Sequence, residues 1–171
     1  IIIPMINEIN SLKKTIGIIS KIKCKKECII IISKSLTSKS TFLELQRLKK
    51  KYSNFFVYIQ KKKFVGGAIA KGIEKSKYTY IAIMAADMET NPYDLKKMVK
   101  ISKYNFKAII SGDRWLNKNS FKKYSFVKLI LNFLAQKIIS LFYNVNLRDF
   151  TFAYRIYPKA ALSKITIDEL R

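Results

Sequence analysis

Histidine is absent from the sequence, and cysteine occurs only as Cys24 and Cys28. A closed zinc site built from these side chains would lack ligands, and the familiar Ser-His and Cys-His nucleophile systems are excluded. Any catalysis must therefore rely on carboxylates, cationic side chains, hydroxyls or a bound metal ion. We interpret the cysteines as reduced thiols of an intracellular protein and expect a cytoplasmic location.

Acidic residues are also scarce, with 11 Asp and Glu against 34 Lys and Arg and a formal net charge of +23. Such a charge attracts nucleic acid, anionic lipid or phosphorylated substrates, although many lysines simply lie on solvated faces. A basic nucleic-acid-binding domain is one alternative, which would bind nucleic acid with a strong dependence on salt. The sequence has no aromatic-flanked basic motif of a known module, so we rank this alternative last and expect no nucleic-acid partner.

The 171 residues are long enough for one domain with a sizeable core, and we expect residues 1–171 to form a single domain. The sequence begins inside an apolar run without an initiator methionine. We therefore expect the domain to be truncated at both ends.

Short apolar runs alternate with segments of helical periodicity along the chain. Strands are predicted at 1–3, 28–32, 55–59, 80–86, 107–111 and 150–158, and helices at 9–19, 42–52, 68–75, 93–103, 126–143 and from 159 onward. This alternation predicts an α/β fold with a mainly parallel sheet flanked by helices. Right-handed crossovers would place the loops after the first, second, fourth and fifth strands along one edge.

Two carboxylates, Asp87 and Glu89, follow the apolar strand predicted at 80–86. Ligands bind at the carboxyl edge of open α/β sheets, and two neighbouring carboxylates repel each other unless a cation lies between them. Mg²⁺ or Mn²⁺ held by one or two carboxylates and substrate phosphates is the usual arrangement. The alternative is that both residues only favour the N-terminus of the helix that begins near Pro92.

The helix predicted at 126–143 has a narrow polar stripe on a mostly apolar circumference. The stripe recurs every four residues as Lys128, Asn132, Gln136 and Ser140. These polar positions argue against a membrane span for a segment of this length. Two interpretations stay open: a core helix packed on the sheet, or a membrane-interfacial helix near 121–143. The cations that would face anionic headgroups in the second case are Lys118, Lys122, Lys123 and Lys128.

Six short motifs follow one another in a defined order. They are 1–8 (IIIPMINE), 66–72 (GGAIAKG), 84–92 (MAADMETNP), 111–114 (SGDR), 132–134 (NFL) and 149–157 (DFTFAYRIY). In this order and spacing they resemble the family-2 nucleotide-sugar glycosyltransferases of the dolichyl-phosphate mannose synthase and polyprenyl-phosphate glycosyltransferase type. The resemblance spans nearly the whole chain.

The resemblance implies a Rossmann-like GT-A fold, a nucleoside-diphosphate sugar donor, and Mg²⁺ or Mn²⁺ held at Asp87 and Glu89. It also implies a polyprenyl-phosphate or glycan acceptor, and a location at the cytoplasmic face of a membrane with peripheral membrane contact. The residues expected to bind the nucleotide sugar are Pro4, Asn7, Glu8, Lys34, Gly67, Ala86, Asp87 and Glu89. Those expected to bind the acceptor are Arg114, Lys128 and Arg155.

The sequence departs from the family pattern at several positions. Ala85 replaces the first Asp of the Asp-x-Asp motif, and Ser33-Lys34 replaces the Asp pair after the second strand. Lys128 replaces a Ser, and Phe152 replaces a Gly. These differences leave a catalytically degenerate GT-A-like binding module as the alternative to an enzyme.

Catalytic roles are predicted for Asp87, as a metal ligand, and for Asp149. An acceptor phosphate oxygen is already anionic and needs no general base, whereas a sugar hydroxyl must lose a proton to a carboxylate. Asp149 is the candidate base in that second case. The alternative is a structural role in which Asp149 orients Arg155.

Overall fold

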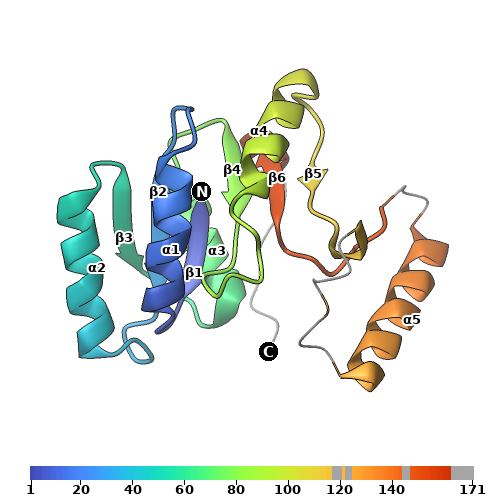
Figure 1. Cartoon of the computed structure of the whole chain (residues 1–171), viewed down its shortest axis with the longest axis horizontal. Coiled ribbons are helices and arrows are strands. Elements are labelled where there is room, and N and C mark those ends of the chain that lie inside the picture. The colour runs from blue at the N-terminus through green and yellow to red at the C-terminus, as the bar shows by residue number, and fades with distance from the viewer. Residues whose placement is uncertain (117–120, 122–124, 144–146, 163–171) are drawn as a thin grey trace.

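The computed structural model describes residues 1–116, 121, 125–143 and 147–162, and Figure 1 shows how strands and helices alternate along them. The strands are β1 (Ile2–Met5), β2 (Cys28–Ile32), β3 (Phe55–Ile59), β4 (Tyr80–Ile83), β5 (Ile110–Ser111) and β6 (Arg155–Pro158). The helices are α1 (Ile9–Ser20), α2 (Lys39–Lys51), α3 (Phe64–Lys75), α4 (Asp94–Tyr104), α5 (Phe126–Phe142) and α6 (Lys159–Leu162), with a 3-10 turn η1 (Arg114–Leu116).

The six strands form one mixed sheet in the order β3-β2-β1-β4-β6-β5. β1, β2, β3 and β4 pair in parallel, whereas β6 is antiparallel to both β4 and β5. The predicted α/β class with a mainly parallel sheet is therefore confirmed.

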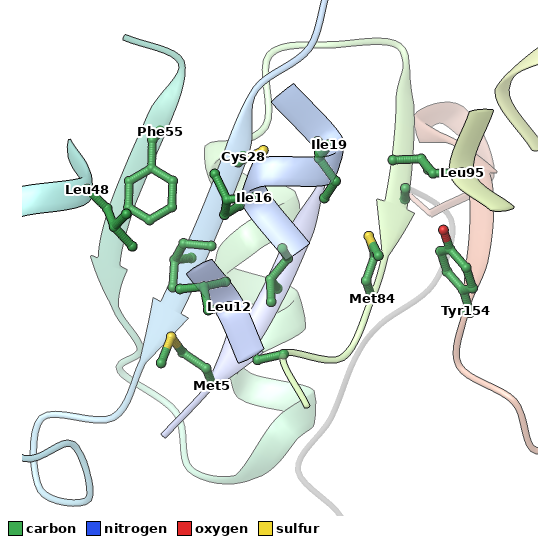
Figure 2. Packing of buried hydrophobic residues seen from close by; sticks show 14 of the residues in the cluster. Met5, Leu12, Ile16, Ile19, Cys28, Leu48, Phe55, Met84, Leu95 and Tyr154 are labelled. Atoms are coloured by element: carbon green, nitrogen blue, oxygen red, sulfur yellow. The ribbon is translucent and has the colours of Figure 1, made fainter. Parts of the chain in front are cut away.

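Each central strand is buried on both faces, as its continuous apolar sequence requires. In β2, Ile30 and Ile32 belong to the larger core cluster, which also contains residues of α1, α2 and α4. Ile29 and Ile31 belong to the second cluster, with residues of α3 and α6. Figure 2 shows the larger cluster, where Leu12 and Ile16 of α1 lie over the sheet.

Several element boundaries differ from the prediction for local reasons. The strand predicted at 107–111 is reduced to β5, because the Ala108 N–H donates to the Asn105 carbonyl in a turn (3.0 Å). The strand predicted at 80–86 ends at Ile83, since the Thr90 hydroxyl binds the backbone N–H and carbonyl of Ala85. The strand predicted at 150–158 begins only at Arg155.

The helix predicted at 126–143 forms as α5, but most of its apolar side chains face solvent, which is the opposite of what a core helix shows. Gln136 of the polar stripe is its buried residue, whereas Leu131 and Leu141 are 62% and 84% exposed. Figure 1 shows α5 set apart from the sheet, beyond β5. The core-helix interpretation is wrong for this structure, because α5 buries Gln136 of the polar stripe and leaves most of its apolar side chains exposed. Lys118, Lys122 and Lys123 lie outside the described residues.

Within the described parts of the chain, no helix has both the length and the apolar character that crossing a bilayer requires.

Candidate functional site

The strand register brings three distant segments to one edge of the sheet. Arg155, the first residue of β6, is paired with Ile83 at the end of β4 and with Ser111 at the end of β5. The loops after β4 and β5 and the segment before β6 therefore meet at the carboxyl edge of the parallel strands. This is the edge at which open α/β sheets bind ligands.

The loop after β4 presents Asp87 and Glu89 to solvent. The Glu89 N–H donates to Oδ1 of Asp87 (2.9 Å), and both side chains are exposed. Between them Met88 has a left-handed backbone (φ 68°), and its sulfur accepts a hydrogen bond from the Thr15 hydroxyl (3.1 Å). The loop is thus held by Thr15 of α1 and by the internal contacts of Thr90. Both carboxylates remain accessible to a ligand.

The carboxylates of Asp87 and Glu89 fit a divalent ion only when a bound ligand supplies further oxygen atoms. Over the described residues, no group of three or more Cys, Asp and Glu side chains is placed to hold a metal ion. Mg²⁺ bound by one or two carboxylates completes its coordination with substrate phosphates and water, and Asp87 and Glu89 match that arrangement.

A cavity of about 550 Å³ lies at the carboxyl ends of the first three strands. Its size falls within the roughly 300–1,000 Å³ typical of small-molecule sites. The lining residues are Pro4, Met5, Ile6, Glu8, Ser33, Ser35, Leu36, Gln60, Lys63, Phe64, Val65 and Ala68. Two of the predicted nucleotide-binding residues, Pro4 and Glu8, are among them.

Asn7 and Glu8 mainly shape the rim of this cavity. The Asn7 side chain donates to the Leu36 carbonyl (3.1 Å) and accepts from the Ser38 N–H (2.9 Å). The Glu8 carboxylate accepts from the N–H groups of Ile6 (2.8 Å) and Asn7 (3.0 Å). Asn7 therefore joins the loop after β1 to the loop after β2, which carries the exposed Lys34.

Gly67 and Ala86 support the edge through packing. A Cβ at Gly67 would lie 2.5 Å from the Lys62 carbonyl oxygen, so only glycine allows α3 to approach that loop. Ala86 is 4% exposed and belongs to the larger core cluster. Neither residue offers a side-chain group to a ligand.

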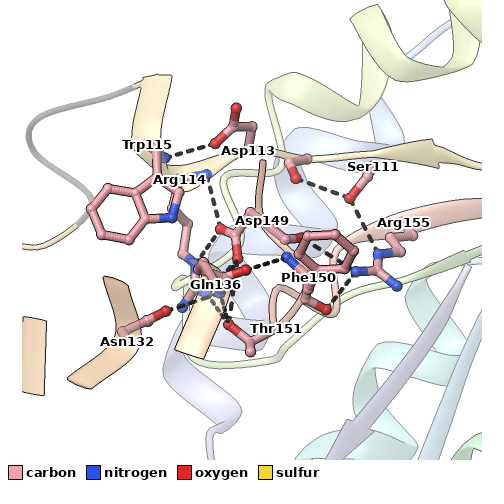
Figure 3. A network of polar contacts seen from close by, with 11 residues as sticks. Ser111, Asp113, Arg114, Trp115, Asn132, Gln136, Asp149, Phe150, Thr151 and Arg155 are labelled. Atoms are coloured by element: carbon pink, nitrogen blue, oxygen red, sulfur yellow. Dashed lines mark hydrogen bonds and ion pairs between the residues drawn. The ribbon is translucent and has the colours of Figure 1, made fainter. Parts of the chain in front are cut away.

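Arg114 and Asp149 form the centre of a polar network beside β5 and β6, drawn in Figure 3. Arg114 donates from Nε to Oδ2 of Asp149 and from Nη2 to Oδ1, both at 2.8 Å. Its backbone N–H also donates to Asp149 Oδ2 (3.2 Å). The guanidinium lies 4.8 Å from the ring centre of Phe152, a cation–π distance.

Asp149 is fully buried in this network. Burial alone raises the pKa of its carboxyl group, but the hydrogen bonds and positive charge of Arg114 outweigh burial and hold the pKa below its usual value. A buried carboxylate with a lowered pKa is a weak proton acceptor. The arrangement fits the structural alternative, with Arg114 as the side-chain partner.

Gln136 of α5 completes the network and was not singled out as a site residue from the sequence. Its amide nitrogen donates to Thr151 Oγ1 (2.8 Å), to Asn132 Oδ1 (3.0 Å) and to Asp149 Oδ1 (3.4 Å). Its amide oxygen accepts from the Phe150 N–H (2.7 Å). The four-residue spacing of the polar stripe was the sequence signal for these contacts.

The other two predicted acceptor-binding residues occupy different positions. Arg155 donates to the Ser111 hydroxyl (3.2 Å) and to the Phe150 carbonyl (2.7 Å), so it holds the segment before β6 against β5. Lys128 lies exposed in the first turn of α5, where its backbone N–H donates to the capping hydroxyl of Ser125 (3.3 Å).

Comparison with known proteins assigns the chain to a protein family. The family model described as Glycosyl transferase family 2 matches residues 1–166, and the chain belongs to this family. The structure is similar to a mannosyltransferase from Pyrobaculum calidifontis solved in complex with GDP-Man and Mn²⁺, with a TM-score of 0.55 and 13% sequence identity. That similarity confirms a GT-A-like fold. It covers 71% of this chain and 37% of the mannosyltransferase. No curated protein matches the sequence.

Proposed function

We propose that this chain transfers a sugar from a nucleoside-diphosphate sugar to a polyprenyl phosphate, with a glycan as the alternative acceptor. The observation that carries the proposal is the position of one cavity and one carboxylate pair on the same sheet edge. The cavity at β1, β2 and β3 takes the nucleoside, and Asp87 and Glu89 after β4 lie beside the diphosphate.

Asp87 and Glu89 would hold Mg²⁺ or Mn²⁺ against the donor diphosphate, and such an ion would neutralise charge that builds up on the leaving group. The solved mannosyltransferase carries Mn²⁺ with GDP-Man, which supports this assignment. Lys34 and Lys63, next to the cavity, add positive charge for the same diphosphate.

Binding of the acceptor is assigned to Arg114, Lys128 and Arg155. Asp149 acts there as a positioning residue that fixes the guanidinium of Arg114. An acceptor that is already anionic needs no general base, and this agrees with the lowered pKa of Asp149. Positioning and charge neutralisation would then supply most of the rate.

The outward apolar face of α5 is assigned to the surface of a membrane. Leu131, Leu141 and Phe142 are all more than half exposed, and a helix with such a face binds the boundary between headgroups and acyl chains. The net charge of +23 favours anionic lipid. We propose a location at the cytoplasmic face of that membrane.

Calorimetric titration with GDP-mannose and UDP-glucose, with and without Mn²⁺, tests the donor site. The chain is expected to bind at least one of them in a metal-dependent manner, and Asp87→Asn is expected to remove the metal dependence. Glu74→Gln removes an exposed carboxylate on α3 and is the matched control. No binding of any donor overturns the proposal.

A catalytically degenerate binding module is the second candidate, favoured by Ala85 at the position of a family carboxylate. It predicts donor binding with no transfer of sugar to a polyprenyl phosphate. A radiolabelled transfer assay in detergent distinguishes the two.

A further inference from the structure

Phe64, the first residue of α3, combines an unfavourable backbone conformation with an exposed side chain. Its φ is 57°, in the left-handed region that side chains with a Cβ rarely adopt. The side chain is 67% exposed and belongs to neither buried core cluster. An exposed aromatic ring on an unfavourable backbone is therefore explained better by a ligand than by stability.

The ring is placed by contacts that fix the loop before α3. The Gln60 side chain donates to the Phe64 carbonyl (3.2 Å) and to the Lys62 carbonyl (2.9 Å). The Gln60 N–H donates to the Ile32 carbonyl at the end of β2 (2.9 Å). The wall of the cavity that carries Phe64 is thus attached to the sheet and is preorganised.

Three further exposed apolar side chains at this edge surround the same cavity. Ile6, Leu36 and Val65 are 41%, 59% and 64% exposed, and all three line it together with Phe64. Phosphates gain little from such walls, whereas a nucleobase offers two flat faces that stack on them. Base stacking on an aromatic ring is a strong and base-tolerant interaction.

We infer that the Phe64 ring is the platform on which the nucleobase of the donor stacks. The inference rests on the proposed function, since it assigns the base to this cavity. It also specifies where the affinity originates. Ser33 and Ser35, whose hydroxyls lie 3.2 Å apart, can each donate or accept, and the Glu8 carboxylate already accepts two backbone N–H groups. Stacking, more than hydrogen bonding to one base, should hold the nucleotide.

The test compares variants at Phe64 with UDP, GDP and inorganic pyrophosphate as probes, all with Mg²⁺. Phe64→Leu is expected to weaken UDP and GDP binding about tenfold and to leave pyrophosphate binding unchanged, because stacking acts on the base alone. Phe64→Tyr is expected to bind like the wild type. In NMR spectra, the upfield ring-current shifts of the uracil and guanine protons should appear with the wild type and disappear with Phe64→Leu.

Phe64→Gly separates stacking from folding. Glycine adopts a positive φ without steric conflict, so this variant is expected to unfold at the wild-type temperature or above it while losing base affinity. Tyr104→Leu, which removes a 78% exposed aromatic ring at the end of α4, is the matched control and should change no affinity.

The outcomes separate the two proposals. If Phe64→Leu and Phe64→Gly both bind UDP and GDP within about twofold of the wild type, the stacking role is overturned. The proposed function is then unaffected. Equal losses for nucleotides and pyrophosphate also overturn the stacking role. A wild-type chain that binds neither UDP nor GDP removes both proposals.

Discussion

Arg114 and Asp149 form a bidentate ion pair between the loop after β5 and the segment before β6, with both N–O distances at 2.8 Å. Arg114 is 13% exposed and Asp149 is fully buried. Truncating one member of a buried pair leaves the other charge without compensation, which typically costs about 3–5 kcal/mol. Asp149→Ala is therefore expected to lower the free energy of unfolding by several kcal/mol, measured by urea denaturation.

Glu74→Gln provides the control for that experiment. It disrupts ion pairs with Lys71 and Lys75 on the exposed surface of α3, where water screens the charges, and should leave the unfolding midpoint nearly unchanged. A loss for Asp149→Ala no greater than that of the control would contradict the structural role of the pair.

The same ion pair predicts how stability depends on pH. The pKa of Asp149 is lower in the folded chain than in the unfolded one, so its contribution to stability is fully present above the unfolded pKa of about 3.9 and is lost as the pH falls through the folded pKa. The wild type should therefore lose more stability than Asp149→Asn on acidification from about pH 5 to pH 3. Parallel curves for the two proteins would show that Asp149 is not the group responsible.

The strands and the sheet edge could be predicted from local sequence. β2 consists of consecutive apolar residues from Cys28 to Ile32, and β-α alternation fixes which ends of the strands form the edge where open α/β sheets bind ligands. Asp87 and Glu89 were placed correctly at that edge for this reason. Pattern and topology suffice when the residues concerned follow directly after a buried strand.

The partners of Arg114 could not be predicted in the same way. Asp149 is 35 residues away in sequence, and nothing local indicates that its carboxylate turns to Arg114 rather than to Arg155. The side of α5 that faces the protein could not be predicted either. Periodicity shows that a helix has a polar stripe with Gln136 in it, but a buried carboxylate elsewhere in the chain decides which side faces the protein.

Thr90 is expected to control the shape of the carboxylate loop. It is 2% exposed, and its hydroxyl contacts the Ala85 N–H (3.2 Å) and carbonyl (3.3 Å). Thr90→Val keeps the shape of the side chain but leaves these backbone groups without their partner, at a cost of about 1–3 kcal/mol. Thermal unfolding should show the loss, and titration with Mn²⁺ and GDP should show weaker binding. Thr90→Ser, which keeps the hydroxyl, should retain the binding.

Gln136 is expected to attach α5 to the rest of the protein. Gln136→Leu removes the acceptor of the Phe150 N–H and a donor to Thr151 and Asp149. Hydrogen exchange of residues 126–142 should then accelerate, because the helix loses its buried polar contact. Ser140→Ala on the same stripe removes only a bond to the carbonyl of Lys137 within the helix and should leave the exchange unchanged. Equal exchange in both variants would show that other contacts hold α5.

The apolar face of α5 is expected to bind membranes without contributing to the fold. Leu131→Glu and Leu141→Glu place charges at positions that are 62% and 84% exposed, so neither should lower the unfolding temperature by much. Both should reduce sedimentation with vesicles that contain anionic phosphatidylglycerol, because a charge in the acyl boundary opposes insertion. Leu43→Glu on α2, at a position that is 61% exposed, tests whether added negative charge alone is sufficient. Equal losses for Leu43→Glu and Leu131→Glu would mean that the vesicles are recognised by net charge, and membrane contact through α5 would then be wrong.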